Sequence, residues 1–150
     1  MARRALIVED EPLIAIDLET TLRTLGFDVC GCASNPREAV ELATSIQPDL
    51  VLMDVYLDGG WDGISAAKWL REACEIPVVF ITGHPDGYTI TRISEEVPNA
   101  PLCIKPFHQE QLTAALADAT SWDAPNRGGL LLVTSRDACT RSHHRASAVN

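Results

Sequence analysis

Long apolar runs are absent from this chain of 150 residues. None approaches the roughly 20 consecutive apolar residues that a membrane-spanning helix needs. The apolar run near the start, residues 5–8, is too short for a signal peptide and is followed by acidic residues, so it is interpreted as a first strand. We therefore expect the protein to stay in the cytoplasm.

Basic residues are also scarce, with 12 lysines and arginines against 21 aspartates and glutamates and a net charge of −9. Residues 1–120 hold 19 of the acidic and 8 of the basic residues, so this part carries −11. It lacks the basic face that nonspecific nucleic-acid binding requires, and nucleic acid is therefore not expected as a partner. An acidic body suits a divalent cation or a basic protein instead.

The five cysteines are an odd number and do not have the spacing of a metal site. Cys30 and Cys32 lie two positions apart on a predicted strand and share a face. We expect small buried thiols in a reducing compartment. No repeat or low-complexity segment is present, and the length suffices for one domain with a hydrophobic core.

What the chain does contain is a regular alternation of apolar runs and helical patterns. Strands are predicted at residues 5–8, 27–32, 49–54, 76–82 and 100–104, and helices at 12–25, 36–46, 63–73 and from 107 to about 120. Residues 86–97 predict only a weak helix, because they are rich in β-branched residues and Pro98 follows. Such alternation implies parallel βαβ units.

The central strand carries the first functional signal. Four apolar residues, 50–53, stand between two aspartates, which is typical of a strand buried on both faces of a sheet. Asp54 follows at the carboxyl end, where open α/β sheets bind their ligands. Other strands end in polar residues too, and because these ends share one edge of the sheet we expect them to meet Asp54: Glu9, Asp10, Thr82 and Lys105.

Grouped carboxylates raise one another's pKa unless a cation joins them. A hard divalent ion such as Mg²⁺ fits, since it takes one or two carboxylates together with water and phosphate oxygens. Lys105 adds a fixed positive charge and Thr82 a hydroxyl donor. The residue types therefore indicate a site for transfer of a phosphoryl group onto a carboxylate.

Residues 4–120 resemble the receiver domain of two-component response regulators. The matching segments are residues 7–12 (IVEDEP), 49–54 (DLVLMD), 62–63 (DG), 80–83 (FITG) and 105–107 (KPF). The resemblance implies an α/β, flavodoxin-like fold: a doubly wound, five-stranded parallel sheet in the order 2-1-3-4-5 with helices on both faces.

The resemblance also implies a role for each site residue. Asp54 becomes the phosphoacceptor, and Thr82 and Lys105 contact the phosphoryl group. Mg²⁺, or Mn²⁺, is held by Asp10, Asp54 and the backbone carbonyl of Tyr56, with help from Glu9 through water. The Lys105–Pro106 bond is expected to be cis. Such a domain is not a conventional enzyme, because it catalyses only its own phosphorylation and dephosphorylation.

Partners follow from the same resemblance. They are a sensor histidine kinase or histidine phosphotransfer protein, a downstream protein target, and a second copy paired through the fourth helix, fifth strand and fifth helix. Residues 1–120 are the expected receiver domain. Residues 121–150 read as a flexible tail without an output domain, although residues 130–133 could dock on the body. Output then runs through protein contact, or the protein is a phosphate sink.

Two other classes of protein are alternatives to a receiver domain, and two positions of this chain differ from those of many receivers. A phosphatase of the haloacid dehalogenase type would carry its nucleophile after the first strand, and a flavodoxin-type flavin binder would not place three acidic residues in its first loop. Leu102 stands where many receivers have an aromatic switch residue, and Gly83 where many have alanine. The chain is thus similar to an atypical receiver subgroup that couples phosphorylation to output differently. In this chain we expect residues 83–97 to be the mobile element, with Gly83 as a loose backbone joint beside Thr82.

Overall fold

The computed structural model of the protein describes residues 2–57 and 62–121. Its central strand is β3 (Leu50–Asp54), and every residue of β3 is buried, as the apolar run predicts. The neighbours of β3 are β1 (Arg4–Val8) and β4 (Val78–Thr82), and the edge strands are β2 (Asp28–Ala33) and β5 (Leu102–Ile104). All strand pairs are parallel, and the predicted order β2-β1-β3-β4-β5 is confirmed.

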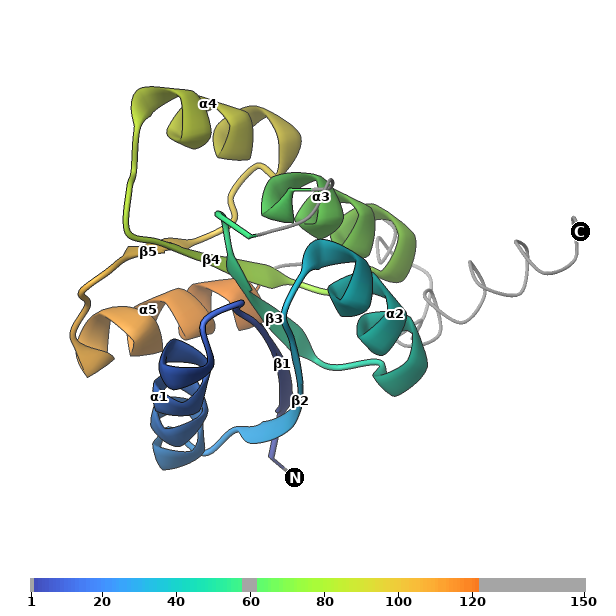
Figure 1. Ribbon diagram of the computed structural model, residues 1–150, viewed down its shortest axis with the longest axis vertical. Coiled ribbons are helices and arrows are strands. Elements are labelled where there is room, and N and C mark those ends of the chain that lie inside the picture. Colours follow the sequence, from blue (N-terminus) through green and yellow to red (C-terminus); the bar gives the residue numbers. More distant parts are fainter. Residues whose placement is uncertain (1, 58–61, 122–150) are drawn as a thin grey trace, which may run out of the picture.

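The helices form a layer on each face of the sheet (Figure 1). α1 (Pro12–Thr24) and α5 (Gln109–Thr120) cover one face, and α2 (Pro36–Ile46), α3 (Gly63–Cys74) and α4 (Gly87–Glu96) cover the other. Successive residues of β3 face opposite layers. Leu50 and Leu52 pack on the side of α1 and α5, and Val51 and Met53 pack on the side of α2, α3 and α4. Each such buried side chain contributes about 1.5–3 kcal/mol to folding.

Three helices begin with a side chain that accepts a hydrogen bond from the first turn. Asn35 accepts from the N–H of Glu38 at the start of α2, and Asp62 accepts from Ser65 at the start of α3. Asp86 accepts from the N–H of Thr89 at 2.7 Å, and so α4 begins in the same way. These caps satisfy amide groups that would otherwise lack a partner inside the helix.

The prediction of only a weak helix at residues 86–97 is wrong. Residues 87–96 form a helix of 10 residues rather than a weak one. The low helix propensity of its β-branched residues is offset by the Asp86 cap and by burial of Thr89 and Ile93 against the core.

A second correction concerns the cysteines. Cys74 and Cys103 are buried as predicted, but Cys32 is exposed and Cys30 only half-buried. Both lie on β2, an edge strand whose residues have less cover than those of the central strands.

Some predictions fall outside the described residues. They concern the tail from residue 122 onward, with its apolar run at 130–133. Within the ranges that are described, no helix combines the length and apolar character needed to cross a membrane.

The first residues of α3 and α4 give a matched test of packing. A Cβ on Gly63 would overlap the main-chain oxygen of Asp54 and lie 3.3 Å from Met53 Cγ, whereas a Cβ on Gly87 would meet no atom within 4 Å. We expect Gly63→Ala to destabilise the protein by about 1–3 kcal/mol, and Gly87→Ala to be neutral or stabilising by up to about 1 kcal/mol. Urea unfolding measures both, and equal effects would contradict the close approach of α3 to Asp54.

Candidate functional site

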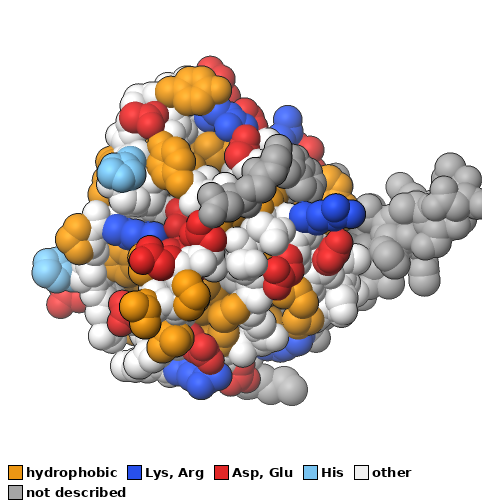
Figure 2. All heavy atoms as spheres, in the orientation of Figure 1, with side chains coloured by type: hydrophobic (Ala, Val, Ile, Leu, Met, Phe, Trp, Pro, Cys, Tyr) orange, Lys and Arg blue, Asp and Glu red, His pale blue; other side chains and the backbone are white. Residues whose placement is uncertain are grey.

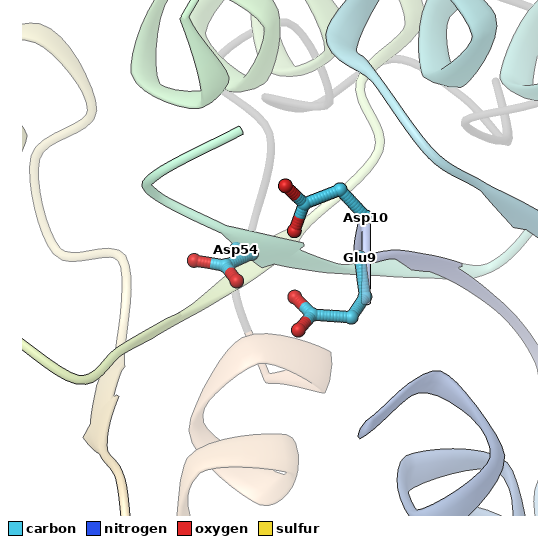
Figure 3. Close-up of side chains that lie close together, drawn as sticks. All are labelled: Glu9, Asp10 and Asp54. Atoms are coloured by element: carbon cyan, nitrogen blue, oxygen red, sulfur yellow. The ribbon is translucent and has the colours of Figure 1, made fainter. Parts of the chain in front are cut away.

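Three carboxylates meet at the carboxyl edge of the sheet. Glu9 and Asp10 follow β1, and Asp54 ends β3; the register pairs Val8 with Met53, which places Glu9 beside Asp54. One oxygen from each of the three lies within 4.8 Å of the others, and Figure 3 shows the side chains directed toward the same space. Glu9 and Asp54 are 4% and 5% exposed, while Asp10 is half-buried. Figure 2 shows acidic side chains gathered in this part of the surface, between α4 and α1.

Lys105 supplies the positive charge of the site. Its Nζ lies 3.1 Å from Oδ2 of Asp54 and 3.5 Å from Oε1 of Glu9. Its backbone N–H donates to the carbonyl of Thr82, and the expected cis peptide bond to Pro106 is present. One ammonium group therefore contacts two buried carboxylates.

The second oxygen of Asp54 is held by the main chain. Oδ1 accepts a hydrogen bond of 3.0 Å from the N–H of Tyr56. Thr82 ends β4 one residue beyond Ile81, the register partner of Asp54, and is fully buried. Its Oγ1 accepts from the N–H of His84 at 3.1 Å. The predicted residues thus come from the ends of four strands and the loop after β3, and all lie at one edge.

The charge of this cluster is not balanced. Burial, and then the hydrogen bond and negative charge of Asp54, raise the pKa of Glu9 to about 8, although Lys105 opposes the shift. Oε2 of Glu9 is also one of two buried side-chain oxygens in the described part of the chain that have no hydrogen-bond partner. A buried acceptor without a partner is costly, so the site favours uptake of a proton or a cation at this point.

A divalent cation of the Mg²⁺ type fits these residues. Carboxylate oxygens are the ligands that it prefers, and three of them converge here from two strand ends. Glu9 also has an oxygen without a hydrogen-bond partner, and a cation bound by these residues would offset the negative charge of its carboxylate.

Other contacts at this edge did not emerge from the sequence. The hydroxyl of Tyr56 lies 2.7 Å from Oδ2 of Asp86 and 2.8 Å from Oγ1 of Thr89. Arg92 on α4 binds Asp62 at 2.9 Å. One signal was available, because the pair Asp86–Gly87 at the start of α4 repeats the pair Asp62–Gly63 at the start of α3.

Fold and site together define a doubly wound α/β protein of the flavodoxin-like class, with an acidic cluster and a lysine at the carboxyl edge of its sheet. The family model of the response regulator receiver domain matches residues 5–117, and the chain belongs to this family. Membership decides against the haloacid dehalogenase and flavin-binding alternatives.

Two curated relatives have similar sequences. The chain is 40% identical over 120 residues to the phyllosphere-induced regulator PhyR of Methylorubrum extorquens, covering 79% of this chain and 44% of that protein. It is 40% identical over 119 residues to the transcriptional regulatory protein PdtaR of Mycobacterium tuberculosis, covering 79% of this chain and 57% of that protein. The chain thus spans about half the length of these relatives.

Solved structures agree with this assignment. The signal receiver domain of a modulated diguanylate cyclase from Desulfovibrio desulfuricans superposes with a TM-score of 0.74 at 35% identity, covering 80% of this chain and 94% of the other. The response regulator PhyR from Brucella abortus gives a TM-score of 0.69 at 36% identity, covering 80% and 48%. These structures carry the same receiver fold.

The unbalanced acidic cluster leads to a prediction about metal binding. We expect Mg²⁺ to raise the free energy of unfolding, by about 1.4 kcal/mol at ten times its Kd, because it binds the folded site only. Asp10→Asn should lose most of this increment, whereas Asp28→Asn, on the exposed first residue of β2, should retain it. Thermal unfolding with Mg²⁺ or with EDTA measures the increments. Equal stabilisation of both variants would mean that the ion binds elsewhere.

Proposed function

We propose that Asp54 accepts a phosphoryl group and that the protein signals through this modification. The observation that supports the proposal best is the setting of one carboxylate. Asp54 is buried at the carboxyl end of the central strand, bonded to Lys105 and to the N–H of Tyr56, with two further carboxylates close by.

The proposed reaction is nucleophilic. A carboxylate oxygen of Asp54 attacks the phosphorus of a phosphohistidine, the phosphorus–nitrogen bond breaks, the imidazole leaves and an acyl phosphate forms. Lys105 pairs with the negative charge on the transferred group, and the hydroxyl of Thr82 donates to one of its oxygens. Hydrolysis by water regenerates the carboxylate, so the domain catalyses only its own modification and its reversal.

In this proposal, Mg²⁺ or Mn²⁺ is held by Asp10, Asp54 and the backbone carbonyl of Tyr56, with Glu9 assisting. The ion offsets the negative charge that the carboxylates and the phosphoryl oxygens would otherwise bring together. Lys105 alone offers one positive charge to two buried carboxylates, which supports the need for a second cation.

The proposed donor is a sensor histidine kinase or a histidine phosphotransfer protein, and the proposed output is contact with a downstream protein. A similar protein of solved structure, PhyR from Bartonella quintana, is an anti-anti-sigma factor. Its name is an example of regulation through contact with another protein. A pair of chains joined through α4, β5 and α5 is a further proposed assembly. A phosphate sink that drains a kinase is the alternative role.

The assignment of Asp54 predicts a simple labelling result. Acetyl phosphate with Mg²⁺ should phosphorylate the protein, and Asp54→Asn should abolish the label because the amide lacks the nucleophilic oxygen while keeping nearly the same shape. Asp28→Asn, on the exposed start of β2, should be labelled like the unmodified protein. Intact-protein mass spectrometry measures the added phosphate. Label on Asp54→Asn, or label that persists in EDTA, would refute the assignment.

The domain boundary is also a proposal. Residues 1–120 are proposed to form the complete receiver domain, since α5 ends at Thr120 and all six proposed site residues precede it. A chain shortened to residues 1–122 should unfold cooperatively and accept phosphate at the same rate as the full chain. Loss of cooperative unfolding, followed by circular dichroism in urea, would place later residues in the core.

A further inference from the structure

Tyr56 contacts two parts of the protein through different groups. Its backbone N–H donates to Oδ1 of Asp54, two residues earlier in the chain, at 3.0 Å. Its hydroxyl reaches the start of α4, where it lies 2.7 Å from Oδ2 of Asp86 and 2.8 Å from Oγ1 of Thr89. Because a tyrosine side chain has only two rotatable angles, it forms a stiff link between these two places.

The hydrogen-bond directions at the hydroxyl are consistent with one another. An ionised carboxylate can only accept, so Tyr56 donates to Asp86, and the Thr89 hydroxyl then donates to Tyr56. The hydroxyl of Tyr56 first, and then the N–H of Thr89, hold the pKa of Asp86 below its ordinary value, which keeps the carboxylate ionised. Asp86 thus caps α4 with one oxygen and binds Tyr56 with the other.

Further contacts join α4 to the same edge of the sheet. Asp62, at the far end of the loop that follows β3, caps α3 and binds Arg92 on α4. The N–H of His84, just before α4, donates to Thr82. The α4 region therefore contacts Tyr56 and Asp62, on either side of residues 58–61. Among the contacts of the described residues named here, the one through Tyr56 leads directly to a hydrogen bond on the Asp54 carboxylate.

We propose that Tyr56 is a positioning residue for the reaction at Asp54, and that its hydroxyl couples the first turn of α4 to the orientation of the Asp54 carboxylate. The inference rests on the proposed function. Leu102 offers no polar group for such a link and packs against the core on the α4 side of the sheet. Coupling between two places is reciprocal, so filling the Asp54 site stabilises the first turn of α4, and loosening that turn weakens the site.

Beryllofluoride with Mg²⁺, a stable mimic of the phosphoryl group, is the probe for this coupling. Tyr56→Phe removes only the hydroxyl and should weaken beryllofluoride binding about fivefold, the change expected from one hydrogen bond of ordinary net strength. Thr89→Val should weaken it in the same direction, although this substitution lies on α4 and leaves the loop intact. Tyr88→Phe is the matched control, because Tyr88 is 75% exposed on the same helix, and it should bind like the unmodified protein.

The double variant separates coupling from general loosening. Tyr56→Phe with Thr89→Val should bind no more weakly than Tyr56→Phe alone, because the contact that Thr89→Val removes is already absent once the Tyr56 hydroxyl is gone. In hydrogen exchange, beryllofluoride should slow the amides of Thr89 and Ile90, which are bonded to Asp86, and this slowing should be lost in Tyr56→Phe.

Three outcomes would overturn the inference. They are undiminished beryllofluoride affinity in Tyr56→Phe, additive losses in the double variant, and equal slowing of the α4 amides with and without the hydroxyl. In each of them the unmodified protein binds the probe, so the proposed function would stand. If the unmodified protein bound no beryllofluoride, the proposed function would fail, and the coupling would fail with it.

Discussion

Two buried carboxylates share one ammonium group, and the carboxyl edge of the sheet depends on this imbalance. Glu9 and Asp54 are both removed from water, and Lys105 contacts both. Burial of charge is unfavourable unless partners compensate it, so the arrangement itself contributes little to stability. Its stability must come from the hydrophobic layers on both faces, which fix the strand ends in place. In the proposed function a phosphoryl group would add negative charge at this edge, and a bound cation would offset it, so that metal binding and phosphoryl acceptance would depend on each other.

The same edge sets the path of the chain after β3. The first turn of α3 approaches the main-chain oxygen of Asp54 so closely that residue 63 has no room for a Cβ. This approach fixes Asp62, which caps α3 and also binds Arg92 on α4. The position of α4 is therefore linked, through Asp62, to the start of α3 and so to the end of the central strand, and α4 is more than a cover for the sheet.

Much of this could be predicted from sequence, for identifiable reasons. A run of four apolar residues leaves no solvent-facing side, which predicts the central strand and places Asp54 at its end. Parallel order then brings the other strand ends together. The stability of α4 was underestimated because its β-branched residues have low helix propensity and the N-cap at Asp86 was not taken into account. The exposure of Cys32 depends on which strand lies at the edge of the sheet, and this is a property of the whole fold. The hydrogen-bond partners of Tyr56 lie about 30 residues further along the chain, so no local sequence pattern predicts them.

The size of the Tyr56 link limits what it can do alone. Tyr56 is 44% exposed, so water competes for its hydroxyl and the net contribution stays near that of an ordinary hydrogen bond, about 1 kcal/mol. Such a contact shifts a two-state equilibrium about fivefold, whereas reversal from 1:99 to 99:1 needs about 10⁴-fold. A complete switch at α4 therefore requires several contacts to change together. The Arg92–Asp62 ion pair and the hydrogen bond from His84 to Thr82 reach the α4 region from the same edge, which makes them the contacts that can add to it.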